Sequence, residues 1–416
     1  MPAGGRFEGA AMSRDKRVVV LGAGPVGLEA AAALAARGAE PTLVEAGDVA
    51  CHVAAWGHVR LFTPFGMNAG PAGRRLLAGM RLPPDDAALT GAELREAYLL
   101  PLAERLAGAA RLETGTRVVA VARSRYLKGD ALGDPARATD PFRLLVERDG
   151  VEAELEAGVV LDCTGTYGRP NHLGPGGAPA VGERALDGRI VRGVPDIAGA
   201  DRGTYAARRT LLVGAGHSAA TAALALSELA RAVPGTSFLW ATRADADRPL
   251  PAIAADTLPP RAALVQAANA LAAAPPAGSA WLGGARVVAL RDAGGAVEVT
   301  LRHARGDRVD RFDRVVALVG YEPDDSIYRQ LQIHECYASR APMKLAAALL
   351  AASGAAAGDC LALGGFGPET LRSPEPGYFI LGAKSYGRTS AFLLRTGYEQ
   401  VEDVVGILGA GDRAAG

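Results

Sequence analysis

The sequence predicts an α/β fold because one pattern of strand, glycine-rich turn, helix and strand occurs twice. The first copy spans 18–45 and the second spans 210–243. Two further apolar runs, 158–165 and 315–320, each end in a small-residue turn. Such runs are typical of the buried strands of a parallel sheet. We therefore expect two Rossmann-like dinucleotide-binding domains, each organised around one copy of the pattern.

Each part of the first copy has a physical reason. Gly22 permits a tight turn, Gly24 lets a pyrophosphate approach the backbone, and Gly27 lets the helix pack closely on the strand. The N–H groups and the dipole at the start of that helix favour phosphate. Glu45 follows the second strand and can accept hydrogen bonds from both hydroxyls of an adenosine ribose. The predicted dinucleotide ligands are Gly22, Gly24, Pro25, Val26, Gly27 and Glu45.

The second copy differs from the first at two positions. Ala219 stands where the third glycine would be, a replacement that helix packing tolerates. The second strand is followed by Arg243 rather than an acid, and arginine can pair with the 2′-phosphate of NADPH through two parallel hydrogen bonds. The alternatives are a solvated loop charge for Arg243 and ordinary helix-start residues for His217 and Ser218. The predicted NADPH ligands are Gly214, Gly216, His217, Ser218, Ala219 and Arg243.

The composition restricts the class of protein. The 416 residues are 49% hydrophobic and carry 45 basic and 45 acidic side chains, so no basic surplus indicates nucleic acid or acidic lipid as a partner. The four cysteines are widely spaced, without a CxxC pair or zinc-type spacing, which favours a reducing compartment. No uninterrupted apolar run has the length of a membrane span. We expect a cytoplasmic protein with a small-molecule substrate, and a loose tail at 1–16.

Two other stretches contain residues that could take part in chemistry. Trp56, His58 and Arg60 lie in the loop after Glu45, which is expected either to wrap around the nucleotide or its ring or to be a packed surface loop. His334-Glu335-Cys336 and Asp359-Cys360 are compact sets of possible metal ligands. Adjacent residues cannot easily all face one ion, so we expect no metal site.

Taken together, these features resemble the flavoproteins with two dinucleotide-binding domains, and within them the flavin-containing monooxygenase branch. Asp162-Cys163-Thr164-Gly165 and Leu318-Val319-Gly320-Tyr321 match the strand ends at which that family crosses between domains. The resemblance implies an FAD domain at 17–185 and 320–416, with an NAD(P)H domain inserted at 186–319. It also implies that the first glycine turn binds FAD and the second binds NADPH. The further FAD contacts that it implies are Trp56, Val118, Thr164, Gly165, Gly382, Ala383 and Lys384.

The sequence departs from that family in two places. The branch usually has Phe-x-Gly-x-x-x-His before the second glycine turn; here Gly188 is kept, but Arg192 takes the histidine position. The family usually ends its last FAD-domain strand with Gly-Asp, and the acid holds the ribityl chain of the flavin. Here the strand is followed by Gly382-Ala383-Lys384-Ser385, so Lys384 or Ser385 is expected to substitute, or Lys384 to reach the pyrophosphate.

The resemblance implies an FAD-dependent, NADPH-using monooxygenase that passes oxygen from a flavin hydroperoxide to a small nitrogen or sulfur nucleophile, with O₂ as co-substrate. The catalytic candidates are Trp56, His58, Arg60, Arg192 and Lys384. One alternative is an FAD-dependent reductase, dehydrogenase or oxidase that uses Cys51 as a single redox cysteine. A second alternative is a catalytically decayed flavoprotein that acts as a redox sensor or binding partner, and a homodimer is also conceivable.

Overall fold

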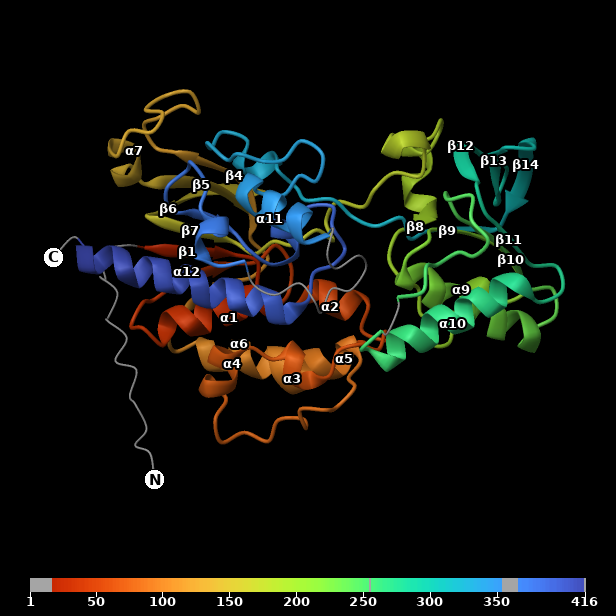
Figure 1. Cartoon of the computed structure of the whole chain (residues 1–416), viewed down its shortest axis with the longest axis horizontal. Helices are drawn as coiled ribbons and strands as arrows, with labels where there is room; N and C mark the ends of the chain where they lie inside the picture. Colours follow the sequence, from red (N-terminus) through yellow and green to blue (C-terminus); the bar gives the residue numbers. More distant parts are fainter. Residues whose placement is uncertain (1–16, 254–255, 354–365, 415–416) are drawn as a thin grey trace. The chain divides into compact units, whose positions relative to one another are not determined.

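The computed structural model describes residues 17–253, 256–353 and 366–414, and the chain divides into two compact units (Figure 1). The first unit contains the residues up to Gly57, Thr63–Gly168 and the residues from Glu322 onward. The second contains His58–Phe62 and Arg169–Tyr321. The chain therefore leaves the first unit and later returns to it. The tail expected at 1–16 lies outside the described residues.

The first unit is built on a parallel sheet with the strand order β16-β7-β1-β2-β3. Every neighbouring pair in it is parallel. The residues that follow β1, β2, β7 and β16 therefore meet at one edge of the sheet, where open α/β sheets bind their ligands. The strands are β1 (Val18–Leu21), β2 (Thr42–Val44), β3 (Arg111–Glu113), β7 (Val159–Asp162) and β16 (Tyr378–Ile380).

The longest helices of this unit are α1 (Pro25–Ala35) and α12 (Leu394–Ala414), which pack side by side (Figure 1). Glu29 of α1 is buried, and its carboxylate accepts hydrogen bonds from the N–H groups of Ala72 and Gly73. This contact fastens the first turn of α4 to α1. The other helices are α2 (Cys51–Ala55), α3 (Phe65–Asn68), α4 (Pro71–Leu76), α5 (Gly91–Leu94), α6 (Leu100–Leu106), α7 (Ala136–Thr139) and α11 (Met343–Ser353), with a π-helical turn at Arg95–Leu99.

A three-stranded antiparallel sheet completes the first unit, and its apolar face shares a core with the parallel sheet. The strands are β4 (Arg117–Arg123), β5 (Phe142–Arg148) and β6 (Val151–Ala157). Phe142 and Leu144 pack with Val19 and Leu21 in one buried cluster. Short 3₁₀ turns lie at Ser326–Tyr328, Pro368–Leu371 and Gly382–Tyr386.

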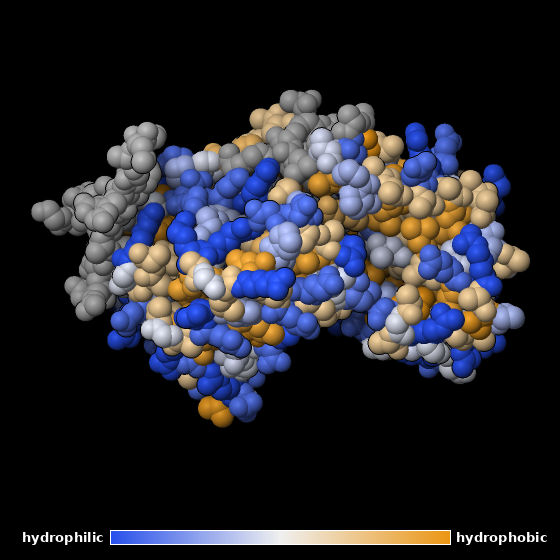
Figure 2. Space-filling model, turned by 90° about the horizontal axis from the view of Figure 1, so that it is seen from below, coloured by the Kyte–Doolittle hydropathy of each residue, from blue (hydrophilic) through white to orange (hydrophobic). Residues whose placement is uncertain are grey.

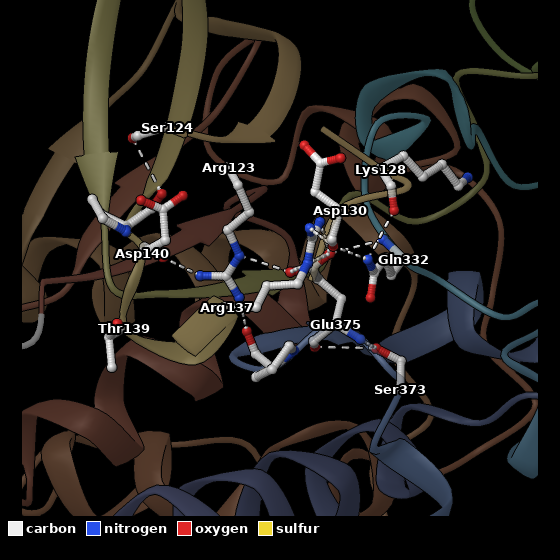
Figure 3. A network of polar contacts seen from close by, with 12 residues as sticks. Arg123, Ser124, Lys128, Asp130, Arg137, Thr139, Asp140, Gln332, Ser373 and Glu375 are labelled. Atoms are coloured by element: carbon white, nitrogen blue, oxygen red, sulfur yellow. Dashed lines mark hydrogen bonds and ion pairs between the residues drawn. The ribbon is translucent and has the colours of Figure 1, made fainter. Parts of the chain in front are cut away.

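A buried ion network ties the loop between β4 and β5 to the C-terminal part of the unit. Figure 3 shows the Glu375 carboxylate between the guanidinium groups of Arg123 and Arg137. The Nε of Arg123 lies 2.7 Å from Oε1 of Glu375, and a terminal nitrogen of Arg137 lies 2.8 Å from Oε2. Gln332 adds a backbone N–H to the same carboxylate at 2.8 Å. All three charged side chains are inaccessible to solvent or nearly so, which makes each dependent on the others.

The second unit repeats the plan with a parallel sheet in the order β11-β10-β9-β15-β8, an antiparallel sheet β12-β13-β14, and two long helices that pack together. In the antiparallel sheet, the middle strand pairs with one neighbour on each side, and both pairings are antiparallel. The elements are β8 (Ile190–Val191), α8 (Arg202–Tyr205), β9 (Arg209–Val213), α9 (His217–Ala232), β10 (Ser237–Ala241), α10 (Pro259–Ala273), β11 (Ala280–Leu282), β12 (Arg286–Asp292), β13 (Val297–His303), β14 (Gly306–Phe312) and β15 (Arg314–Ala317), with 3₁₀ turns at Pro175–Gly177 and Arg184–Arg189.

The boundary between the units lies at Gly168, earlier in the chain than the boundary expected at 185. Leu173 packs into a core cluster of the second unit. Pro170 forms a bridge with Tyr321, and Val181 forms one with Ala289. The Gly- and Pro-rich composition of segment 169–185 is typical of a linker. Its few apolar residues nevertheless pack it onto the second unit.

Candidate functional site

The first glycine turn has the geometry of a phosphate-binding turn. Gly22 adopts φ +93°, and a Cβ there would lie 2.8 Å from the carbonyl oxygen of Cys163. A Cβ at Gly27 would overlap the carbonyl oxygen of Gly22, so helix α1 approaches the turn as closely as a glycine allows. A Cβ at Gly24 would meet nothing within 4 Å. Two glycines therefore have packing roles, and the third leaves an open backbone at the helix start.

Glu45 lies beside this turn, directly after β2. Its Oε2 accepts a hydrogen bond from the N–H of Ala23 at 2.8 Å, and its Oε1 accepts one from Gly47 at 2.9 Å. The thiol of Cys51 also faces Oε1, at 3.7 Å. Burial raises the pKa of the Cys51 thiol, and the Glu45 carboxylate raises it further. Cys51 is therefore held as a thiol beside the predicted ribose acid, which is unfavourable for a redox nucleophile.

Three turns far apart in the sequence meet at the carboxyl edge of the first sheet. The turn after β7 touches the first glycine turn, as the contact between Gly22 and Cys163 demonstrates. The turn after β16 approaches the same place, because a Cβ at Gly382 would lie 3.3 Å from the side chain of Val26. Most of the predicted FAD ligands are thereby gathered within one region of one unit.

Lys384 connects the turn after β16 with the turn after β7. Its Nζ lies 2.6 Å from Oδ2 of Asp162 and donates to the Thr164 hydroxyl at 3.0 Å, and both charged side chains are inaccessible to solvent. Tyr378 donates to the same Oδ2 at 2.9 Å. The ammonium also lies 4.9 Å from the ring centroid of Tyr328. Lys384 thus forms a buried ion pair with Asp162. This differs from the expected contact of Lys384 with the pyrophosphate.

The remaining candidates of the first unit lie around α2 and β4. Trp56 ends α2 against the backbone of Gly91, and its indole nitrogen is buried without a hydrogen-bond partner among the described residues. Val118 lies in β4 beside a register shift. His58 and Arg60 are exposed and belong to the short segment that joins the second unit. The structure therefore assigns these two residues to a different unit from that of Trp56, although they are close in sequence.

The second glycine turn repeats the packing of the first. Gly214 has φ +143°, and a Cβ there would collide with the carbonyl oxygen of Leu318. A Cβ at Gly216 would meet nothing within 4 Å, and Ala219 is fully buried. Trp240 of β10 donates its indole N–H to the carbonyl of Gly214 at 2.8 Å. This hydrogen bond fixes the turn and is not visible in the sequence pattern.

The first turn of α9 holds His217 and Ser218, two further predicted NADPH residues. His217 packs edge-on against Phe62, with ring centroids 5.4 Å apart. Burial lowers the pKa of His217, and the nearby Arg261 guanidinium lowers it further, so its imidazole is neutral at pH 7. Arg261 is itself buried and pairs with Asp256 at 2.6 Å. The segment between β10 and β11 therefore contributes charged residues near this helix start. Ser218 and Arg243 are exposed.

Arg192 lies among acidic side chains and a backbone carbonyl of the segment before β8. Its guanidinium contacts Asp187 at 2.8 Å, Glu183 at 3.0 Å and the carbonyl of Asn171 at 3.0 Å. Glu183 is fully buried and also accepts hydrogen bonds from the N–H groups of Leu173 and Ala180. These contacts hold the segment before β8 together, so the hydrogen bonds described for Arg192 are with its own segment rather than with the second glycine turn.

Two polar contacts near the first sheet edge are not predicted by the sequence. Asp162 was recognised only as part of a strand end, although an acid that closes an apolar strand is itself a signal of a buried polar contact. The other is the Tyr328 hydroxyl, which donates to Glu335 at 2.6 Å. Burial raises the pKa of Glu335. Within the described residues no group of three or more potential metal ligands is found, and Asp359-Cys360 lies outside them.

The residues at the first sheet edge fit an adenine dinucleotide. Gly24 leaves an open backbone before the N-terminus of α1, and Glu45 supplies a carboxylate. The buried indole nitrogen of Trp56 has no hydrogen-bond partner among the residues that the structure describes. The second sheet edge offers the open Gly216 and the exposed cation Arg243. Figure 2 shows hydrophilic and hydrophobic residues interspersed over the visible face. No helix in the described parts of the chain has both the length and the apolarity to cross a membrane.

Comparison with known proteins agrees with this geometry. Residues 17–54 match the pyridine nucleotide-disulphide oxidoreductase family. No curated protein matches the chain by sequence.

Solved structures of similar fold cover nearly the whole chain. A bacillithiol disulfide reductase from Bacillus cereus has a TM-score of 0.66 at 17% identity, covering 95% of this chain and 99% of that one. An ornithine N-hydroxylase from Kutzneria sp. 744, solved with reduced FAD, NADP⁺ and L-ornithine, has a TM-score of 0.63 at 15% identity, covering 95% and 99%. A thioredoxin reductase from T. acidophilum has a TM-score of 0.59 at 16% identity, covering 96% and 100%. These likenesses confirm the predicted fold class, an α/β fold with two Rossmann-like domains.

Proposed function

Starting from the two-domain fold of the FAD/NAD(P)-binding oxidoreductases, which this chain has, we propose that it is an NADPH-using flavin monooxygenase acting on a small nitrogen or sulfur nucleophile. The observation that carries the cofactor assignment is the difference between two otherwise similar sheet edges. Glu45 follows β2 in one unit, whereas the exposed Arg243 follows β10 in the other. A carboxylate suits the hydroxyls of an unphosphorylated ribose, and a guanidinium suits a 2′-phosphate.

Different residues of the chain would bind FAD and NADPH. The first glycine turn and the start of α1 would hold the FAD pyrophosphate, and Glu45 would hold its ribose. The second glycine turn, the start of α9 and Arg243 would hold NADPH. When bound, FAD would supply the hydride and oxygen chemistry, while the protein supplies orientation and excludes water.

Cys51 and Cys163 favour oxygen transfer over disulfide reduction. Disulfide chemistry by a protein dithiol needs two cysteines close together, and Cys51, Cys163 and Cys336 are all free in the described residues. Burial raises the pKa of the Cys163 thiol, as it does for Cys51. Neither group has the thiolate character that a redox cysteine needs.

A reductase that lacks a cysteine pair is the second candidate, because two of the structures of similar fold are disulfide reductases. The experiment that separates the two candidates begins with purified protein whose bound flavin is identified by release and chromatography. NADPH oxidation, O₂ uptake and peroxide are then followed together with small amines, thiols and thioethers. Substrate-dependent O₂ uptake without peroxide is the expected result. With a small disulfide added as the electron acceptor, NADPH oxidation that continues at the same rate without O₂ would instead establish a reductase.

A further inference from the structure

The buried pair of Lys384 and Asp162 lies directly beneath the turns at the first sheet edge, and the proposed reaction does not use it. Lys384 belongs to the turn after β16, and Asp162 is the last residue of β7. Their side chains are both fully removed from solvent, with Nζ and Oδ2 2.6 Å apart. Burying two charges costs free energy that an apolar pair of the same shape would avoid, so the pair needs a reason beyond packing.

The hydrogen bonds around Asp162 are saturated, and they converge on Thr164. Oδ1 of Asp162 accepts from the backbone N–H of Thr164 at 3.1 Å and from its hydroxyl at 2.7 Å. The hydroxyl then accepts from Lys384 at 3.0 Å. A hydroxyl has one proton to donate and lone pairs to accept with, so the Thr164 side chain is held at both ends. The turn that continues into Gly165 is therefore fixed from two directions.

This anchoring reaches the first glycine turn. Cys163, between Asp162 and Thr164, presents its carbonyl to Gly22, and Gly382, two residues before Lys384, packs against Val26. The lysine consequently joins the turn after β7 to the turn after β16, and the first glycine turn lies against both. Ala383 occupies the place where the resemblance expects an acid, and the buried carboxylate of this edge, Asp162, ends the neighbouring strand β7.

We propose that Lys384 is a positioning residue for the flavin dinucleotide, acting through Asp162 and Thr164 rather than by touching the cofactor. The inference rests on the proposed binding of FAD to the first unit. It explains why the side chain is fully buried although it lies among the predicted FAD ligands. A cation here holds Thr164 and Gly165 in the conformation that the cofactor meets, and an apolar residue of similar length cannot supply the bond to the Thr164 hydroxyl.

The test separates positioning from stability with two variants. Lys384→Met alone leaves the Asp162 carboxylate buried without its cation, so the apoprotein should melt at a lower temperature. Lys384→Met combined with Asp162→Asn removes both charges, so most of the melting temperature should return. The dissociation constant for FAD, measured on apoprotein by quenching of flavin fluorescence, should stay raised by about tenfold or more in the double variant, because the bond that orients Thr164 is still missing. Lys344→Met, at an exposed lysine of α11, is the matched control and should change neither quantity.

Each outcome of these measurements either supports the positioning role or overturns it. Restored melting temperature with persistently weak FAD binding supports the positioning role. Restoration of both quantities together, or FAD affinity that never changes, overturns it and leaves the pair a purely structural one. Wild-type apoprotein that binds no FAD overturns the proposed function and this inference with it, whereas wild-type binding with unaffected variants overturns the inference alone.

Discussion

Arg192 shows how one side chain acquires a structural role from its neighbours. The fully buried Glu183 carboxylate depends on it for charge compensation. Burial alone would raise the pKa of Glu183, but the N–H groups of Ala180 and Leu173 and the Arg192 cation lower it overall. A carboxylate with a lowered pKa stabilises the fold above its unfolded value of 4.5, and that stability is lost as the pH falls through the folded value.

We expect Arg192→Met to reduce the free energy of unfolding by about 3–5 kcal/mol at pH 7, because it leaves a buried carboxylate without its cation. The acid-induced loss of structure should also begin at a higher pH than in the wild type. Urea unfolding followed by circular dichroism at several pH values measures both effects. Arg189→Met, which removes a largely exposed pair with Asp292, should cost no more than about 1 kcal/mol. Equal effects of the two substitutions would contradict the structural role of Arg192.

Arg243 is the residue on which the choice of nicotinamide cofactor depends. Its side chain is exposed at the end of β10, where a ribose phosphate would approach. Arg243→Ala should weaken NADPH binding by about tenfold or more, through loss of a charge-assisted contact, and leave NADH nearly unaffected. Titration of the protein with each cofactor provides the measurement. Loss of both affinities in equal measure, or of neither, would show that the 2′-phosphate lies elsewhere.

At the scale of the element, Gly24 and Gly27 of the first turn have different roles, one in cofactor binding and one in helix packing. A methyl group at Gly24 enters open space, whereas one at Gly27 overlaps the Gly22 carbonyl. Gly24→Ala should therefore keep the melting temperature of the apoprotein and weaken FAD binding. Gly27→Ala should lower the melting temperature, because α1 must move away from the turn. Differential scanning fluorimetry with and without FAD distinguishes the two, and a reversed order would reject these roles.

The loop between β4 and β5 depends on the ion network of Glu375. Glu375→Gln leaves the buried guanidinium groups of Arg123 and Arg137 with no carboxylate between them (Figure 3). We expect a loss of about 3–5 kcal/mol in the free energy of unfolding. Glu154→Gln breaks an exposed pair with Arg143 and serves as the control, with an expected cost below about 1 kcal/mol. Chemical denaturation of both variants checks the difference.

At the scale of the whole molecule, two units with separate sheets and cores predict separate responses to the two cofactors. FAD should slow amide hydrogen exchange around 22–28, 45–47 and 162–165, where the first sheet edge is assembled. NADP⁺ should slow it around 214–219 and 242–244 in the second unit. Hydrogen-exchange mass spectrometry with each cofactor alone measures this. Protection of the second glycine turn by FAD, with the first turn unchanged, would reverse the cofactor assignment.

The prediction from sequence succeeded where the signal was local. The spacing of Gly22, Gly24 and Gly27 predicted the turn geometry, because the absence of a Cβ has the same consequence wherever the turn occurs. The charged residues in the sequence predicted less of the site, because the partner of a charged side chain depends on the tertiary structure. Lys384, considered as a ligand of the cofactor, pairs with Asp162, which lies far from it in the chain.

The sequence by itself determined the two repeated strand–turn–helix units, the strands around them and the resemblance to a family of oxidoreductases. All of these depend on periodicity and on residues that are close in the chain. Only the tertiary structure decided that segment 169–185 joins the second unit, that Arg192 supports Glu183, and that the turns after β7 and β16 meet beside Gly22. These contacts arise when parallel strands distant in sequence become neighbours, and no local pattern specifies which strands those are.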